Sequence, residues 1–258
     1  MSITCHDTES VRARLRAVQQ RIAQAERQYG RAPGAVTLLA VSKASPALAI
    51  QAVHAEGQTL FGESYLQEAL PKIEALQGQG MEWHFIGPLQ SNKTKHIAQH
   101  FAWAHSIDRE HIAQRLSAQR CLSVQNHRAL PPLNICLQVK VGDEAQKAGV
   151  NVSDQAAVMT LAHAVAKLPQ LKLRGLMAIP VPLQDFDAQR RAFSAVRKTF
   201  ERLNEDGLAL DTLSMGMSND MEAAIAEGAT IVRIGSAIFS AWSKVGTSKP
   251  GTCAGERM

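Results

Sequence analysis

The chain has 258 residues and a mass of 28.0 kDa, a length that suits one large domain or two small ones. Hydrophobic residues form 45% of it and charged residues 20%, enough to bury a substantial core. Neither an apolar signal peptide nor a long apolar span is present, which argues against a secreted or membrane-spanning protein. Because the four cysteines also form no CxxC motif, we expect a cytoplasmic protein with reduced thiols.

The formal net charge of +5 owes much to a cluster of arginines near the amino terminus. The cluster consists of Arg12, Arg14, Arg16, Arg21, Arg27 and Arg31. Such a stripe could meet a polyanion, but few aromatic residues interleave with it, which argues against a platform for stacked bases. We therefore expect a solvated helix face here, and no nucleic-acid partner.

The predicted elements begin with an amphipathic helix over residues 8–29, where apolar side chains recur at helical spacing. After a lead-in that ends at Gly34, short apolar runs alternate with helical patterns. Strands are predicted at 37–42, 59–62, 83–87, 102–107, 134–141, 173–179, 212–217 and 230–234. Helices are predicted between them at 46–56, 65–76, 92–99, 109–123, 154–167, 187–204 and 221–227.

Eight strands that alternate with helices predict an α/β fold, a (β/α)8 barrel. A doubly wound sheet is the alternative, but it would more often carry a Gly-rich dinucleotide turn after its first strand, and none is present. Residues 1–242 are then one barrel domain, in which 1–34 form the amino-terminal helix and lead-in. Residues 243–258 are predicted to be a flexible tail.

Lys43 stands at the carboxyl end of the first predicted strand, before a helix that Ser45 and Pro46 are predicted to begin. Barrels and doubly wound sheets build their sites at that end of the strands. A lysine amine beside apolar walls loses its charge readily and can form a Schiff base. The alternative is a lysine that only reaches the rim and keeps its amine in solvent.

The loops after the seventh and eighth predicted strands are the usual phosphate site of a barrel. The first loop carries Gly216, Ser218 and Asn219, and either Ser218 or Asn219 is predicted to cap the next helix. The second loop carries Gly235 and Ser236, which offer backbone N–H groups and a hydroxyl. Ordinary helix caps would explain either loop alone. Both loops together, at neighbouring strand ends, favour a phosphate site.

Arg233 interrupts the apolar eighth strand, and a buried arginine needs a partner. That partner is either another core group or a ligand near Lys43. A Schiff-base lysine, a phosphate cradle and an arginine at one barrel mouth suit pyridoxal 5′-phosphate (PLP), whose ring nitrogen would meet Arg233. Because arginine does not readily release a proton, the ring nitrogen would stay unprotonated, which restrains carbanion chemistry.

Several long motifs occur in order along the chain. They are LLAVSKASP (38–46), FGESYLQEAL (61–70), WHFIGPLQSNK (83–93), HSIDR (105–109), LRGLMAIP (173–180) and LSMGMSNDMEAAIAEGATIVRIGSAIF (213–239). On these motifs the sequence resembles the pyridoxal phosphate homeostasis protein family, from about Leu38 to Phe239.

The resemblance implies a single TIM barrel of the alanine racemase N-terminal type, preceded here by an extra helix. It implies a non-catalytic protein that holds PLP as a Schiff base on Lys43 and takes part in intracellular vitamin B6 homeostasis. In the family pattern the phosphate contacts fall on Ser218, Gly235 and Ser236, and the ring-nitrogen contact falls on Arg233.

Departures from the family pattern lie near the implied site. Ser64 stands where the family has an asparagine beside the cofactor, and Lys140 replaces an asparagine after the fifth strand. Lys147 keeps a family lysine that is a candidate secondary contact for PLP, and Ser236 keeps the hydroxyl of a common threonine. We expect these changes to bear on affinity or exchange rate and to leave the anchor at Lys43 intact.

The resemblance favours a carrier that sequesters PLP and passes it on, with apo PLP-dependent enzymes as candidate recipients. No dimerisation segment is obvious, so a monomer is expected. The alternative to a carrier is a racemase-like PLP enzyme. Racemases of that type add a second domain and take a catalytic tyrosine from a partner subunit, whereas this sequence ends soon after its eighth strand and has only Tyr29 and Tyr65. A PLP-free aldolase-type enzyme that uses Lys43, or a nucleic-acid module, is a further alternative.

The histidines give less guidance. His84 and His105 lie on or near predicted strand ends, where they either line the mouth or are satisfied residues of the core. His54, His96 and His163 have no metal-ligand spacing, so no metal site is predicted.

Overall fold

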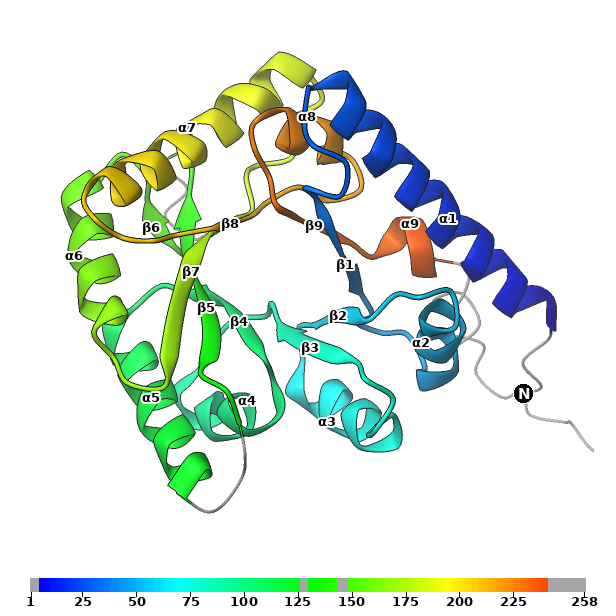
Figure 1. Ribbon diagram of the computed structural model, residues 1–258, viewed down its shortest axis with the longest axis horizontal. Coiled ribbons are helices and arrows are strands. Elements are labelled where there is room, and N and C mark those ends of the chain that lie inside the picture. The colour runs from blue at the N-terminus through cyan, green and yellow to red at the C-terminus, as the bar shows by residue number, and fades with distance from the viewer. Residues whose placement is uncertain (1–4, 126–129, 143–147, 241–258) are drawn as a thin grey trace, which may run out of the picture.

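The computed structural model describes residues 5–125, 130–142 and 148–240, and within them parallel strands close into a barrel (Figure 1). Around the barrel the strands follow the order β4, β3, β2, β1, β9, β8, β7, β5, and a pairing between β4 and β5 completes the circle. Their bounds are β1 Thr37–Val41, β2 Leu60–Glu63, β3 Glu82–Phe85, β4 Trp103–Ile107, β5 Leu133–Lys140, β7 Leu171–Ala178, β8 Thr212–Ser214 and β9 Ile231–Ile234. The predicted eight-stranded barrel is therefore confirmed.

Helices surround the barrel and link its strands (Figure 1). They are α1 Cys5–Gln28, α2 Ala47–His54, α3 Leu66–Ala75, α4 Thr94–His100, α5 Glu110–Gln125, α6 Gln155–Ala166, α7 Phe186–Glu205, α8 Met221–Ala226 and α9 Ser236–Phe239, with a 3-10 turn η1 at Ser91–Lys93. Two short elements were not predicted. The strand β6, Val150–Asn151, pairs with the end of β5, and α9 is a single turn.

The predicted amino-terminal helix is confirmed as α1, and it packs outside the β/α repeats against α2, α8 and α9. The arginines of α1, and Arg31 just after it, do more than face solvent. Arg16 pairs with Glu56 at 2.8 Å, Arg21 pairs with Glu222 at 2.7 Å, and Arg31 donates to the Ile225 carbonyl at 3.0 Å. The expected solvated stripe is thus partly an attachment surface, because these contacts fasten α1 to the barrel.

Buried side chains form two separate layers. A large apolar cluster fills the space between the strands and the surrounding helices. A small one, Trp103, Cys136 and Met177, is distinct from it and comes from β4, β5 and β7. The barrel lumen also holds buried polar residues, among them His84, His105, Ser214 and Arg233. The interior of this barrel therefore differs from the branched aliphatic filling that is usual for the fold.

The structure also bears on the thiols, on membrane spans and on the predicted tail. Among the cysteines whose side chains the structure describes, Cys121 and Cys136 are free thiols, as predicted. A search of the described helices for an apolar stretch that could cross a membrane finds none. The predicted tail, 243–258, lies outside the described residues.

Arg120 of α5 connects three segments of the chain near the start of β5. It is 1% exposed, and its guanidinium donates to the carbonyls of Ala98 (2.5 Å) and Phe101 (3.1 Å). It also donates twice to the carbonyl of Pro131, at 3.0 and 2.7 Å, just before β5. One buried cation on α5 therefore satisfies carbonyls at the end of α4 and before β5.

We expect Arg120→Met to lower the free energy of unfolding by about 3 kcal/mol, because it leaves buried carbonyls without donors. Arg115→Met is the matched control, since Arg115 is exposed on the same helix, and it should change stability by less than about 0.5 kcal/mol. Urea titration of the three proteins measures both values. Equal stability of the two variants would contradict this account of Arg120.

Candidate functional site

Lys43 lies on a turn just beyond β1, and its side chain is exposed. The turn closes with a hydrogen bond from the Ser45 amide to the Ser42 carbonyl at 3.0 Å, and Ala44 has a left-handed φ of 57°. The prediction that Ser45 caps the next helix is wrong. Helix α2 starts at Ala47 with Pro46 in the N-cap position and no side-chain cap, because Ser45 is used in the turn.

Residues of β2 and α3 hold this turn in place. Ser42 donates its hydroxyl to Glu63 at 2.6 Å, and Lys72 donates both to Glu63 at 2.8 Å and to the Ser42 carbonyl at 2.9 Å. The Ala44 amide donates to Glu68 at 3.0 Å. We call Glu63, Glu68 and Lys72 the turn clamp. Sequence reasoning missed it because its members come from separate elements.

Glu63 is the buried centre of the turn clamp, with 0% exposure. Burial raises the pKa of its carboxyl, while the hydrogen bond and charge of Lys72 act in the opposite direction. Its second oxygen, Oε2, has no hydrogen-bond partner among the residues that the structure describes. The carboxylate therefore depends on Lys72 for its ionised form.

The loops after β8 and β9 meet at the same end of the barrel. The hydroxyls of Ser218 and Ser236 are 3.3 Å apart. Within the described chain, the backbone amides of Ser218, Asn219, Ser236 and Ala237 have no acceptor. We call these two hydroxyls and four amides the serine cradle. Such a set of outward N–H and O–H donors suits an oxyanion.

The predicted caps of α8 are wrong in detail. Asp220, and neither Ser218 nor Asn219, occupies the N-cap position, and its carboxylate accepts from the Met217 amide at 2.6 Å. This contact leaves the hydroxyl of Ser218 free to face Ser236. The loop is anchored from outside, because Arg21 donates to the Ser218 carbonyl at 3.3 Å.

The serine cradle lies beside the Lys43 turn because β9 pairs with β1. Ala40 is opposite Ile234 in this parallel pair, so Gly235 comes next to Val41. A Cβ atom on Gly235 would lie 3.1 Å from the Val41 carbonyl oxygen. The glycine thus permits a close approach of the two strand ends, two residues before Lys43.

Arg233 points into the lumen and is 4% exposed. Its Nη1 donates to the carbonyl of Ser214 and, at 2.9 Å, to the Ser214 hydroxyl, and its Nη2 donates to the Ala178 carbonyl at 2.9 Å. Ser214 and Ala178 are the last residues of β8 and β7, so the guanidinium lies at the carboxyl end of the barrel. Burial lowers the pKa of Arg233 to about 10, which still leaves it charged at neutral pH.

Two donors of Arg233 are left over. A guanidinium has five N–H groups, and three are used by Ser214 and Ala178. Its Nε–H and one Nη2–H have no acceptor among the described residues, and Nε is not among the fully enclosed unpaired atoms. The sequence left open whether the partner of Arg233 is a core group or a ligand. Core groups take three donors, and two remain for a ligand.

Other predicted site residues are more loosely placed. Ser64 is half-buried just after β2. Its backbone packs so closely on Gly87 that a Cβ atom on Gly87 would lie 2.0 Å from the Ser64 carbonyl oxygen. Lys140 ends β5 and is half-buried. Lys147 lies outside the described residues.

The lumen below Arg233 contains a run of polar side chains that sequence reasoning did not assign. His105 contacts the Ser214 hydroxyl at 2.9 Å, His84 contacts His105 at 2.9 Å, and Glu82 contacts His84 at 2.9 Å. We call Glu82, His84, His105 and Ser214 the lumen relay. Of the alternatives for the two histidines, the structure supports satisfied core residues.

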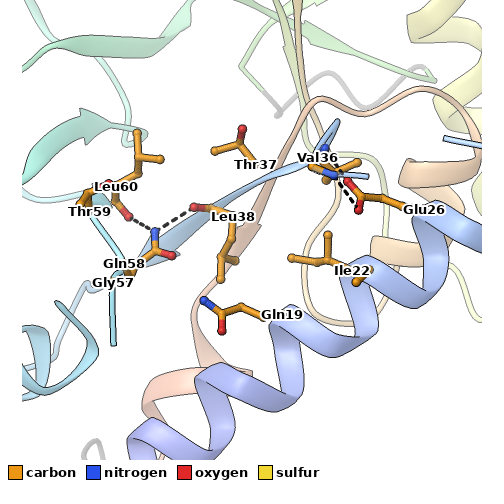
Figure 2. A pocket seen from close by; sticks show the side chains of 12 residues that line it. Gln19, Ile22, Glu26, Val36, Thr37, Leu38, Gly57, Gln58, Thr59 and Leu60 are labelled. Atoms are coloured by element: carbon orange, nitrogen blue, oxygen red, sulfur yellow. Dashed lines mark hydrogen bonds between the residues drawn. The ribbon is translucent and has the colours of Figure 1, made fainter. Parts of the chain in front are cut away.

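A cavity of about 390 Å³ lies at the opposite end of the barrel, between α1 and the starts of β1 and β2 (Figure 2). Figure 2 shows Glu26 accepting from the amide of Val36 and Gln58 donating to the carbonyls of Leu38 and Leu60. The polar groups of its wall are thus used to hold the barrel base together. In this fold that end serves stability, whereas sites lie at the other end. A search of the described residues finds no cluster of His, Cys, Asp and Glu that could hold a metal.

Comparison with known proteins shows the family to which this barrel belongs. Residues 13–242 match the family model described as alanine racemase, N-terminal domain. The pyridoxal phosphate homeostasis protein of Pseudomonas aeruginosa is 55% identical over 87% of this chain and 92% of its own length. The chain therefore belongs to the pyridoxal phosphate homeostasis protein family, within the alanine racemase N-terminal fold.

Solved structures extend the comparison. PipY of Synechococcus elongatus, solved with PLP bound, is 35% identical with a TM-score of 0.70, over 84% of this chain and 99% of PipY. Alanine racemase of Corynebacterium glutamicum is 15% identical with a TM-score of 0.61, over 93% of this chain and 64% of the racemase. At that identity the second likeness concerns the fold alone.

We expect Lys72→Met to destabilise the protein by about 3 kcal/mol at about pH 8, because it leaves Glu63 as an unpaired buried charge. The pKa of Glu63 is already raised in the folded state, and loss of Lys72 raises it further. A carboxyl group of this kind costs stability only when ionised, so the loss should shrink toward about pH 5. Urea titrations at the two pH values measure it.

The matched control is the double variant Glu63→Gln/Lys72→Met. It contains no unpaired buried charge, so it should recover stability relative to Lys72→Met and show little pH dependence. An equal loss for Lys72→Met at both pH values would show that the turn clamp is not electrostatic.

Proposed function

We propose that this protein binds PLP at the carboxyl end of the barrel and takes part in intracellular PLP homeostasis without acting as a catalyst. The observation that carries the proposal is the meeting of three groups at that end: the Lys43 turn, the serine cradle and the two unused donors of Arg233. The names of the relatives support it, as does the PLP bound in PipY.

The residues present fit the chemistry of PLP. Lys43 would supply the amine for its aldehyde, since the side chain is exposed and the turn clamp fixes its backbone. The serine cradle, together with Gly235 just before Ser236, would receive the phosphate. An unused donor of Arg233 would meet the ring nitrogen, which is an acceptor when unprotonated. Ser64 and Lys147 are proposed as further contacts.

A carrier role is favoured over a racemase-like activity on physical grounds. Bound PLP supplies an electron sink, and the permanent charge of Arg233 opposite its ring nitrogen would keep that sink weak. The exposure of Lys43 suits entry and departure of the cofactor. Apo PLP-dependent enzymes are the proposed recipients. The cytoplasmic location and the monomeric state stay predictions.

Lys43→Ala is expected to abolish the yellow colour and the borohydride-sensitive absorbance that wild-type protein should gain with PLP. Lys93→Ala is the matched control, because Lys93 also follows a strand at this end of the barrel, on η1, and should leave the absorbance unchanged. Mass spectrometry of the reduced protein should locate the pyridoxyl group on Lys43. Reduction onto a different lysine would overturn the assignment.

Carrier and enzyme are separated by a second measurement. We expect loaded protein to restore activity to an apo PLP-dependent enzyme faster than spontaneous release into buffer allows. We also expect no racemisation across a panel of amino acids above the rate of free PLP. Transfer no faster than release would contradict direct delivery, and robust turnover of any amino acid would contradict the non-catalytic role.

A further inference from the structure

The lumen relay forms a continuous path of hydrogen bonds across the barrel. It starts at Arg233 on β9 and passes through Ser214 on β8 and His105 on β4 to His84 on β3. It ends at Glu82, the first residue of β3. The bond between His105 and Ser214 spans the lumen, because β4 and β8 are not neighbours in the sheet. The path therefore joins the carboxyl end of the barrel to the amino end.

The chemistry of its two ends fixes the direction of every bond. Arg233 can only donate, so the Ser214 oxygen accepts and its proton is available for Nδ1 of His105. Glu82 accepts from His84 Nε2 and from the Trp103 indole at 3.0 Å, and these contacts lower the pKa of its carboxyl. His84 then carries its proton on Nε2, accepts at Nδ1, and receives the Nε2 proton of His105.

Burial agrees with this arrangement of protons. His84 and His105 are 1% and 0% exposed, and burial lowers the pKa of both, so each imidazole is neutral. The opposite direction would need a protonated Glu82, although that side chain is 44% exposed. The other charged groups near the path are Asp220, which faces Arg233, and Arg174, which lies over Trp103 and pairs with Asp211. None of them interrupts the sequence of donors.

We propose that the lumen relay is a positioning device for Arg233, which orients the guanidinium so that its unused N–H groups face the cofactor ring. The inference rests on the proposed function, because it concerns the ring-nitrogen contact. His105 accepts the Ser214 proton and so turns the lone pairs of that hydroxyl toward Nη1. Glu82 holds the tautomers of both histidines from the far end of the barrel.

The first test uses the cofactor-free protein. Nitrogen NMR of labelled histidine should show His84 and His105 as neutral Nε2–H tautomers at neutral pH. In Glu82→Gln the new amide can donate to His84, so a second tautomer should appear at both histidines. A wild-type imidazolium, or an Nδ1–H tautomer at either histidine, would overturn the proposal whatever the protein binds.

The second test measures PLP affinity and the visible spectrum of the loaded protein. Ser214→Ala removes one acceptor from a charged donor, so we expect affinity to fall about tenfold. Glu82→Gln should also weaken PLP binding, although Glu82 lies at the other end of the barrel. Both variants should shift the absorbance maximum of the loaded protein, and in the same direction as each other. Cys136→Ala is the control, since Cys136 is buried in the lumen outside the relay, and its spectrum should match wild type.

The outcomes distinguish the two proposals. Binding and a normal spectrum in Ser214→Ala and Glu82→Gln would leave the proposed function standing and remove the relay. A wild-type protein that fails to bind PLP would remove the proposed function, and with it the role of the relay, even if the NMR test finds the expected tautomers. Loss of binding in the control as well would show that any change in lumen packing matters, which contradicts a specific role for the relay.

Discussion

The parallel pairing of β1 with β9 is the constraint on which the candidate site depends. These are the first and last strands of the barrel in sequence, and in register Leu39 lies opposite Arg233. This pairing brings the Lys43 turn, the serine cradle and Arg233 to one end, although the chain between them makes the rest of the barrel. Contacts outside the pair then refine the positions, with the turn clamp on one side and Arg21 on the other.

A polar barrel interior is costly unless its groups satisfy one another. In this lumen the side chains of Ser214, His105, His84 and Glu82 do so in one chain of hydrogen bonds that begins at Arg233, which keeps two donors unused. A different arrangement is found at Glu63, where one carboxylate oxygen lacks a partner among the described residues. The two groups support different parts of the proposed site, because the relay ends at Arg233 and Glu63 bonds to Ser42, the residue before Lys43.

Much of the fold could be predicted because each long element has its own periodicity. The eight strands and the helices between them were found with shifts of a few residues. The strand β6 and the helix α9 have two and four residues, too short for a pattern to register. The cap at Ser45 was wrong because a tertiary use of that residue, in the Lys43 turn, outweighs its local preference.

The site was predictable only in part. Lys43, Arg233 and Ser236 stand out since charged or hydroxyl residues at the ends of apolar strands need an explanation. His84 and His105 were ambiguous, because alternation along a strand shows that two residues share a face without showing what lies across from them. The ion pair between Glu63 and Lys72 could not be predicted from the sequence, because the two side chains meet only when α3 packs beside β2.

The attachment of α1 has a consequence for how the protein is made. This helix precedes every strand of the barrel in the chain and is synthesised before them, yet Arg21 bonds to Glu222, 201 positions later. Its docking surface on α8 and α9 does not exist until the ribosome has finished the last β/α unit. The part of α1 that packs against α8 and α9 therefore stays uncovered until almost the whole barrel has been translated, so the nascent chain exposes apolar surface for that time.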